Sequence, residues 1–598
     1  MNRLNKLAAI LATIALFGST YLLAEDLPAA ATADTVRKEM QQDVVLRALV
    51  DELTRNIERL KIEDMAHPYF IEYALTDGTG ASVSARLGAV TSRRADSRSR
   101  RLRTDVRVGD YELDNTNFQS GGFGDFGFGG MGGGMSGISV PIEDDYTAIR
   151  QALWWATDRD YKSVVEALER KKAFMETKLI EDKPEDFSRE KPSLHFEPQV
   201  RVELDLAALE KLAVELSSIF REFPDVQSSI VSASGGASNR YLVNSEGTRI
   251  RTANTSYSIT ITATVQADDG MKMTDTITER AESLDKLPPH SDLEKHCREM
   301  VAQLLKIKDA PKLDAYTGPV LFDARPAAQI FSQTFSSRFA GGQRPVGGQA
   351  QPDDFEKKIG TTILPKSFTV IDDPTREEID GTPVAAHYRY DQQGVPAQSV
   401  MLVEKGKLLA QVMSRNPSKV AKSSTGHGRG DWRPSASTGC LVVQTKGGKS
   451  DDDLKQKLIE LCEQEDLEFG IRIAALGATS GGMDNRFSML MESLGGDFGF
   501  NRFGGAAATP LAIYKIYRDG REELVRGAEI ARIDLKAFKR IPATGKTLYV
   551  HNTGSGASAK TVAAPAMLFE ELDLAKIDRD FDKPPILPTP LARADREN

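Results

Sequence analysis

Residues 258–266 read Ser-Ile-Thr-Ile-Thr-Ala-Thr-Val-Gln, and this stretch decides what kind of fold the chain can adopt. Its apolar side chains alternate strictly with hydroxyl and amide side chains. Because successive side chains of a β-strand point to opposite faces, this period of two predicts a strand with one buried and one polar face. A half-buried strand is typical of an antiparallel sheet, so residues 258–266 predict such a sheet in the middle of the chain.

Helical and strand patterns alternate on both sides of this strand. In four segments apolar residues recur at helical spacing. Residues 69–108 and the region from Gly318 onward instead have the pattern of strands. Turns are expected at Asp77–Gly80 and, nearer the C-terminus, at residues 391–394, 404–406 and 518–520. Helices are expected at residues 44–60, 146–175, 205–223 and 293–305. The chain is therefore predicted to be an α+β protein.

The length of 598 residues predicts about three or four domains, and a hydrophobic content of 40% is enough to build their cores. Changes in pattern set the expected boundaries. They are a signal peptide at 1–24, a small N-terminal α+β domain at 40–115, a Gly-rich loop or linker at 116–140, a central domain of helices and antiparallel strands at 141–310, a strand-rich C-terminal domain at 315–582 and a Pro-rich tail at 583–598.

The first 24 residues have the pattern of a secretory signal. Arg3 and Lys6 precede an apolar run over residues 7–17, and small residues follow as far as Ala24. The run is shorter than the ~20 apolar residues of a membrane span, although an uncleaved anchor extending to Leu23 stays open. No other segment approaches that length. We therefore expect an exported protein of the periplasm or cell envelope, with no stable membrane span apart from the signal.

The net charge of −9 argues against nucleic acid as a partner, because an acidic protein repels phosphate backbones. A cluster of arginines is expected to lie on a solvated strand face. Its members are Arg93, Arg94, Arg98, Arg100, Arg101 and Arg103. The three cysteines, Cys297, Cys440 and Cys462, form neither a disulfide framework nor a CxxC motif. A single bridge such as Cys440–Cys462 stays open.

Motifs for nucleotide binding and hydrolysis are incomplete. Residues 121–137 contain a literal GxGxxG without the strand and helix that dinucleotide binding needs, so we interpret them as a mobile loop. The GKS at 448–450 and the GKT at 545–547 lack the first glycine of a phosphate-binding loop, and neither GxSxG nor HExxH occurs. His290 and His296 do not share a helical face and suggest a solvated helix start. His427 and His551 lie in Gly- and Ser-rich stretches, which makes them weak site candidates.

Short phrases occur in a fixed order between Tyr241 and Gly527. They are YLVNSEGT at 241–248, YTGPVLF at 316–322, DQQGVPAQ at 391–398, STGHGR at 424–429, GDFGF at 496–500 and the pair DG and RG at 519–520 and 526–527. In this order they resemble phrases of the TldD/PmbA family, which includes modulators of DNA gyrase and is classed with the metallopeptidases. The resemblance implies that residues 141–310 and 315–582 are the central and C-terminal domains of that family.

The resemblance also implies where a zinc site would lie. Catalytic TldD-type members carry an HExxxH helix shortly after the GPV strand, with two histidines on zinc, a glutamate as general base and a further cysteine near the C-terminus. Here the motif positions fall on Ser332, Gln333 and Ser337, and no cysteine follows Cys462. Serine is a poor zinc ligand and glutamine cannot accept a proton. The chain therefore resembles the PmbA (TldE) type, which lacks the metal site and pairs with a TldD-type subunit.

Three functions stay open at this point. The first is a non-catalytic subunit that binds unfolded peptide as an added strand and partners a TldD-like zinc peptidase or itself, with zinc in the partner and no cofactor here. The second is a peptidase or hydrolase with a rebuilt site. Its polar loop candidates are His427, Asp431, Asp484, Asp497 and His551. The third is a structural or binding protein that keeps only the fold.

Overall fold

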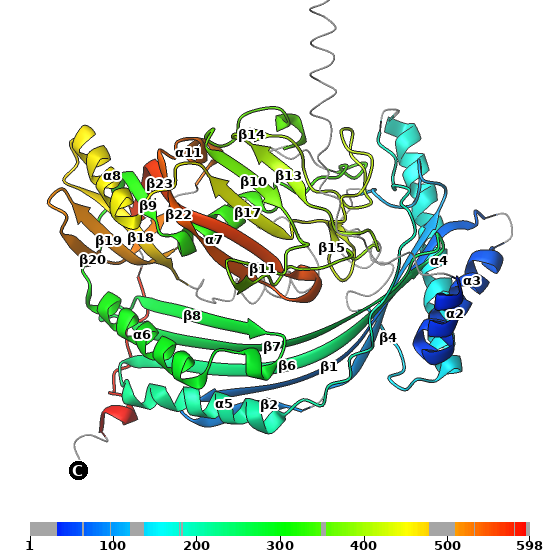
Figure 1. The fold of residues 1–598 in the computed structure, drawn as a ribbon, viewed down its shortest axis with the longest axis horizontal. Helices are drawn as coiled ribbons and strands as arrows, with labels where there is room; N and C mark the ends of the chain where they lie inside the picture. The colour runs from blue at the N-terminus through cyan, green and yellow to red at the C-terminus, as the bar shows by residue number, and fades with distance from the viewer. Residues whose placement is uncertain are drawn as a thin grey trace, which may run out of the picture.

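The computed structural model has an α+β architecture built on two large sheets, which confirms the predicted fold class (Figure 1). The structure describes residues 33–62, 65–95, 97–119, 137–178, 180, 183–348, 355–477, 509–530, 533–578 and 580–593. The predicted signal at 1–24, residues 120–136 of the Gly-rich loop, the GDFGF phrase, Asp484 and Asp497 lie outside the described residues.

The first sheet has eight strands in the order β4-β3-β1-β6-β7-β5, with β2 paired to β1 and β8 paired to β7. Its strands are β1 Pro68–Arg86, β2 Ala89–Arg94, β3 Ser99–Val108, β4 Ile138–Ser139, β5 Leu194–Phe196, β6 Val226–Asn244, β7 Arg249–Gln266 and β8 Lys272–Ala281. The alternating stretch 258–266 is the second half of β7, and β7 pairs antiparallel with both β6 and β8 as predicted. The long strands curve across the molecule (Figure 1).

The turn predicted at Asp77–Gly80 is wrong, because β1 continues straight through it. Gly78 lies opposite Ser238 and Gly80 opposite Gly236, so the neighbouring strand β6 supplies the hydrogen bonds that override the local turn preference. The pairing of β1 with β6 extends from Glu72 to Ala85. One sheet therefore joins the residues assigned to the N-terminal domain with those assigned to the central domain.

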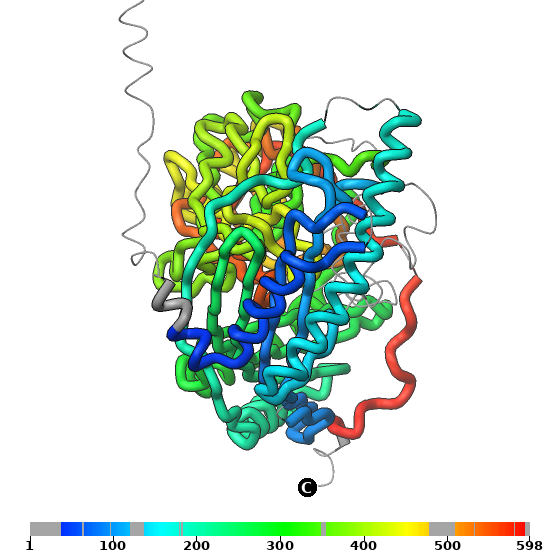
Figure 2. The backbone as a smooth tube through the Cα atoms, turned by 90° about the vertical axis from the view of Figure 1, so that its right-hand side faces the viewer, coloured from blue at the N-terminus to red at the C-terminus, as the bar shows by residue number. Residues whose placement is uncertain are grey.

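Helices cover one end and one face of this sheet. Helix α3 (Val44–Arg59) begins where Asp43 accepts a hydrogen bond from the Leu46 amide, and it packs with α2 (Ala33–Gln42) and α4 (Tyr146–Lys178) beside β1 and β3 (Figures 1 and 2). Helices α5 (Leu206–Ser218) and α6 (His290–Asp309) cover the convex face, where the apolar half of β7 is buried. Helix α6 continues four residues beyond the predicted end at Leu305 and stops before Pro311.

The second sheet has eleven strands in the order β14-β13-β10-β17-β23-β9-β18-β19-β20, with β21 and β22 on β23. Its strands are β9 Tyr316–Phe322, β10 Phe368–Asp372, β13 Val400–Glu404, β14 Lys407–Leu408, β17 Cys440–Thr445, β18 Phe469–Leu476, β19 Pro510–Tyr517, β20 Glu522–Val525, β21 Ala528–Ile530, β22 Ala543–Thr553 and β23 Lys560–Lys576. The predicted turns at 391–394, 404–406 and 518–520 are confirmed.

Helix α7 (Ala324–Phe335) packs its aromatic face on β23, while α8 (Asp451–Gln464) and the short α11 (Leu535–Lys539) also flank this sheet. Two small ribbons complete the C-terminal half. They are β11 Glu378–Ile379 with β12 Thr382–Pro383, and β15 Gly428–Arg429 with β16 Ser435–Ala436. None of the helices in the described residues combines the length and the apolar character that crossing a membrane requires.

The two sheets belong to one body that is joined at both ends of the first sheet. At one end Arg526 pairs with Asp269 at 2.8 Å, and at the other Arg415 binds both carboxylate oxygens of Glu246 at 2.7 Å. The C-terminal segment then returns to the first sheet, where the Gln266 side chain donates to the Asp582 carbonyl at 2.8 Å. Figure 2 shows this segment, in red, running along the outside of the body.

Candidate functional site

Helix α7 carries the positions where the resemblance places a zinc site. Gln333 is exposed, Ser337 is exposed just beyond the end of α7, and the half-buried Ser332 has its Oγ 3.4 Å from Ser336 Oγ. The opposite side of the helix is buried through Phe331 and Phe335. Nowhere in the described ranges do three His, Cys, Asp or Glu side chains gather as metal ligands. The residues present therefore do not fit a catalytic zinc, since hydroxyl and amide groups are weak ligands for it.

His427 lies in a fully buried polar cluster next to strand β15. Its Nδ1 donates to the Thr425 carbonyl at 2.8 Å, and its Nε2 stands 3.8 Å from Asp372 Oδ2 without a hydrogen bond. Asp372 itself accepts the backbone amides of Gly439 at 2.9 Å and Cys440 at 2.7 Å. The carboxylate nearest to His427 is therefore already committed to backbone donors.

Asp391 is the second buried carboxylate of this cluster. It accepts three backbone amides, from Gln393 at 2.8 Å, Val395 at 2.9 Å and Gly428 at 2.8 Å. Burial raises the pKa of Asp391, and these three hydrogen bonds act in the opposite direction. The bond from Gly428 joins the phrases DQQGVPAQ and STGHGR, which meet here in space. Their role is thus to brace two loops against each other.

The close approach of these loops explains one glycine of STGHGR. Gly426 has a φ of +71°, and a Cβ at this position would lie 2.1 Å from the Pro396 carbonyl oxygen. Only glycine fits a left-handed conformation with so little space. Tyr388 closes the same junction by donating its hydroxyl to the Gly426 carbonyl at 2.9 Å, and the Arg429 guanidinium lies 4.1 Å from the centre of its ring.

His551 lies on β22 opposite Val562, so its placement in a loop is wrong. The reason is that the small residues around it alternate in a strand that pairs along β23. Burial, together with the neighbouring Arg325 and Arg280, lowers the pKa of His551 to about 4. His427 instead neighbours Asp372 and Tyr388. The two histidines of the rebuilt-site hypothesis therefore have separate surroundings, and Asp431 is exposed.

The expectation of a wholly solvated arginine face is also wrong in part. Arg93, Arg94, Arg98 and Arg101 are exposed, but Arg100 and Arg103 are buried. Arg100 binds Asp77 at 2.7 Å and Arg103 binds Glu72 at 2.8 Å. Acids on the adjacent strand β1 compensate the charge of these buried guanidinium groups.

Neither the histidines of α6 nor the cysteine thiols form a metal-binding or catalytic site within the described residues. His290 and His296 are solvated and stand 3.6 Å and 3.9 Å from single carboxylates, those of Glu215 and Glu279. The bridge left open for Cys440 and Cys462 is not formed, since all three cysteines are free and buried. Burial raises the pKa of the Cys440 thiol to about 12, so it is not an activated nucleophile.

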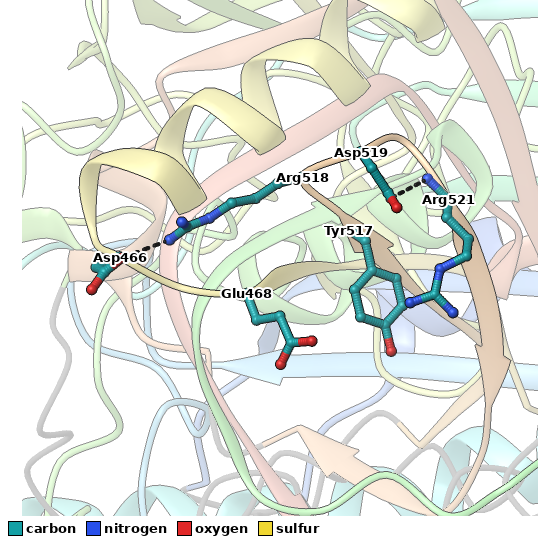
Figure 3. Close-up of a pocket in the computed structure, with 6 residues that line it drawn as sticks. All are labelled: Asp466, Glu468, Tyr517, Arg518, Asp519 and Arg521. Atoms are coloured by element: carbon teal, nitrogen blue, oxygen red, sulfur yellow. Dashed lines mark hydrogen bonds and ion pairs between the residues drawn. The ribbon is translucent and has the colours of Figure 1, made fainter.

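A surface hollow of 460 Å³ lies between the β19–β20 turn and the segment that precedes β18 (Figure 3). Both of its arginines already have partners within the hollow. Arg518 binds Asp466 at 2.9 Å, and Arg521 lies 3.9 Å from the centre of the Tyr517 ring. Because the arginines that line it already have partners, this hollow offers little to a charged ligand.

The inner face of the first sheet, which points away from α5 and α6, is lined by hydroxyl groups. We call it the hydroxyl face. Its members are Ser84, Ser232, Ser234, Ser258, Thr260, Thr262, Thr264, Thr274, Thr276 and Thr278. Cross-strand hydroxyl pairs connect them at 2.9 Å for Ser84 with Ser232, 2.9 Å for Ser234 with Ser258 and 3.0 Å for Thr262 with Thr276. Apart from Thr278, these side chains are half-buried, and most of them are the polar half of the alternation in β6, β7 and β8.

Strand β8 forms the edge of the sheet that lies nearest the C-terminal half (Figure 1). It pairs with β7 on one side, and within the described part of the chain no strand pairs with its other side. Arg325 of α7 approaches this outer edge, with its Nη2 3.4 Å from Asp275 Oδ1 and 3.5 Å from the Thr276 carbonyl. The Thr276 carbonyl therefore points outward, toward α7.

Sequence reasoning missed Arg280 and Arg325, which stand beside this edge. A signal for Arg280 was present, because it continues the alternation of Thr274, Thr276 and Thr278 and so shares their face. No signal in the sequence placed Arg325 beside it, since α7 and β8 meet only through the packing of the two halves.

Comparison with known proteins fits this architecture. The PmbA/TldA metallopeptidase central domain matches residues 192–303, and the PmbA/TldA metallopeptidase C-terminal domain matches residues 315–467. The chain is a TldD/PmbA family protein. The second match includes β9, α7 and the cluster of Asp391 and His427, while the first includes β6, β7 and β8.

Solved structures of similar fold extend the likeness over most of this TldD/PmbA family protein. A protein from Thermotoga maritima assigned as a modulator of a DNA gyrase is 13% identical, with a TM-score of 0.55 over 90% of this chain and 100% of its own. TldE from Thermococcus kodakarensis is 16% identical, with a TM-score of 0.54 over 88% of this chain and 100% of its own. A protein from Bacteroides thetaiotaomicron that is also assigned as a modulator of DNA gyrase is 14% identical. Its TM-score is 0.51, over 91% of this chain and 99% of its own. No curated protein is significantly similar.

Proposed function

We propose that this TldD/PmbA family protein is an exported, non-catalytic subunit that binds unfolded peptide along strand β8 and works with a TldD-type zinc peptidase. The observation that carries the proposal is the outer edge of β8, which no described strand covers. This edge lies between the hydroxyl face and helix α7. An extended peptide can join such an edge through main-chain hydrogen bonds alone, which requires no particular sequence.

The hydroxyl face supports binding of polar backbone next to this edge. Its serine and threonine side chains are both donors and acceptors, so they can follow the carbonyl and amide groups of a peptide in more than one register. Because these side chains already pair across strands, for example Thr264 with Thr274 at 2.9 Å, they are held in place before a ligand arrives. A preorganised polar surface loses less conformational entropy on binding.

The α7 positions support the non-catalytic part of the proposal. Ser332, Gln333 and Ser337 supply neither an imidazole ligand nor a base, so peptide held at β8 would have to be cleaved by zinc that a partner contributes. Co-purification from the native host should therefore yield a TldD-type subunit with stoichiometric zinc. Zinc bound to this chain alone, with cleavage that a chelator stops, would refute the non-catalytic role.

The pattern of the first 24 residues supports export to the periplasm or cell envelope. Fractionation of the native host should place the mature chain outside the cytoplasm. Full-length protein in the soluble cytoplasmic fraction would contradict this part of the proposal without bearing on peptide binding.

The edge itself can be tested with Thr276→Pro. Because the Thr276 carbonyl points outward, its amide points outward as well, where it donates to the Asp275 carboxylate at 2.8 Å. A peptide carbonyl would take this donor over from Asp275, and proline removes it without breaking the β7–β8 ladder. We expect binding of a labelled, unstructured ten-residue peptide, followed by fluorescence anisotropy, to weaken at least about tenfold. Thr276→Ser, which keeps both the backbone donor and the hydroxyl group, should bind nearly as well as the parent. Unchanged binding by a folded Thr276→Pro variant would contradict the proposal.

A further inference from the structure

We propose that Arg280 forms a carboxylate-binding subsite at the end of the hydroxyl face, and that the chain therefore prefers peptides that place a carboxylate there. This inference rests on the proposed function, because the peptide must first lie along β8. It adds a specificity-determining residue to a surface that otherwise binds backbone.

Strand register fixes the direction of the Arg280 side chain. Arg280 lies directly opposite Ser258 of β7, and Ser258 is hydrogen bonded to Ser234 of β6 on the hydroxyl face. Thr278, two residues earlier, is within 3.3 Å of Thr260 on the same face. Because residues two apart on a strand share a face, Arg280 points to the hydroxyl face and ends the row of Ser234 and Ser258.

Arg280 differs from the buried arginines of this sheet because it has no partner among the residues that the structure describes. It makes no hydrogen bond and no ion pair with any residue that the structure describes, although its side chain is half-buried. Arg100, Arg103 and Arg251, in contrast, each bind at least one carboxylate at 2.7–2.8 Å. Burial lowers the pKa of Arg280, yet a guanidinium keeps its charge at neutral pH. A half-buried cation without a counter-ion is a ready site for an anion.

The neighbours of Arg280 set the charge of that anion. Arg325 adds a second cation, but Asp275 stands 3.4 Å from it and offsets its charge. His551, which neighbours both arginines, is neutral at neutral pH because its pKa is about 4. With the charge of Arg325 offset by Asp275, Arg280 supplies a single positive charge at this end of the hydroxyl face, which matches a single carboxylate better than a phosphate dianion. The adjacent Ser258 hydroxyl can donate a further hydrogen bond to the same carboxylate.

The experiment compares matched peptides on the full chain. Three unstructured ten-residue peptides are needed: a neutral one with an amidated C-terminus, the same peptide with a free C-terminal carboxylate, and the amidated peptide with one internal glutamine replaced by glutamate. We expect at least one acidic peptide to bind about tenfold more tightly than the neutral one, as a hydrogen-bonded ion pair would provide. Whether the terminal or the internal carboxylate gives the gain identifies its source.

Variants then locate the subsite. Arg280→Gln should reduce the preference for the acidic peptide to less than about twofold, and Arg280→Lys should keep part of it, since lysine retains the charge but not the fork geometry. Arg101→Gln, which removes an exposed arginine from β3 of the same sheet, should keep the full preference. This control separates local recognition from a change in net charge.

The outcomes distinguish the two levels of the proposal. Equal affinity for neutral and acidic peptides would overturn the carboxylate subsite and leave peptide binding at β8 intact. A preference that survives in Arg280→Gln would overturn the assignment to this residue. Failure of all three peptides to bind would overturn the proposed function together with the subsite.

Discussion

The cluster of Asp391 and His427 and the cluster of Arg280 and His551 contain similar groups but use them in opposite ways. In the first, the carboxylates of Asp372 and Asp391 accept five backbone hydrogen bonds from Gly439, Cys440, Gln393, Val395 and Gly428. In the second, the half-buried Arg280 has no partner in the described structure. Buried carboxylates that are satisfied by backbone donors stabilise a fold, whereas a half-buried charge with no partner among the described residues is prepared for a ligand.

The strongest test of this contrast is Asp391→Ala. It removes three hydrogen bonds to a buried carboxylate and leaves three amides without an acceptor, so we expect a loss of about 3–5 kcal/mol in the free energy of unfolding. Urea denaturation followed by circular dichroism measures it. Asp391→Asn, which keeps one acceptor oxygen, should lose clearly less. A loss below about 1 kcal/mol in Asp391→Ala would mean that the cluster does not brace its loops.

The pH dependence of stability tests the second cluster. His551 has a pKa of about 4 in the folded chain and an ordinary pKa of 6.5, so the unfolded chain takes up a proton first as the pH falls. Its contribution to stability is complete above pH 6.5 and is lost as the pH falls toward 4, by at most about 3 kcal/mol. His551→Gln should lack this component. The difference in urea midpoint between parent and variant, followed from pH 7.5 to 4, isolates it from carboxylate titration.

A smaller effect is expected from Arg280→Gln on stability. Because the guanidinium is half-buried and has no partner in the described part of the chain, its removal relieves a desolvation cost, and the free energy of unfolding should stay within about 1 kcal/mol of the parent or rise. Thermal unfolding without peptide measures this. A marked loss of stability would show that Arg280 has a structural partner and would weaken its assignment to ligand binding.

The smallest effect is expected for Gln333→Glu on α7. Its side chain is exposed, so the free energy of unfolding should change by less than about 0.5 kcal/mol, and restoring the acid without histidine ligands should not create zinc binding. Calorimetry with zinc chloride and peptide cleavage assays check both expectations. Stoichiometric, tight zinc binding by this variant would show that α7 has other ligands nearby.

Much of the fold could be predicted from the sequence because its signals are local. The alternation of residues 258–266, the apolar spacing of residues 44–60 and the turn at residues 391–394 each depend on neighbours along the chain, and all three are confirmed. The turn at Asp77–Gly80 failed because pairing with β6 outweighs local preference. The loss of the zinc motif at Ser332, Gln333 and Ser337 could also be predicted from the sequence, since residue type alone decides whether a side chain can bind zinc.

The sequence by itself determined that the chain alternates apolar and hydroxyl residues, lacks the zinc motif and carries the phrases of its family. Only the tertiary structure decided what these residues do together. It joined DQQGVPAQ to STGHGR through Asp391 and gave His427 and His551 separate surroundings. It also placed Arg325 of α7 against Asp275 and Thr276 at the edge of β8. The physical reason is that burial and charge compensation depend on groups distant in sequence, whose proximity is set by how the two sheets pack.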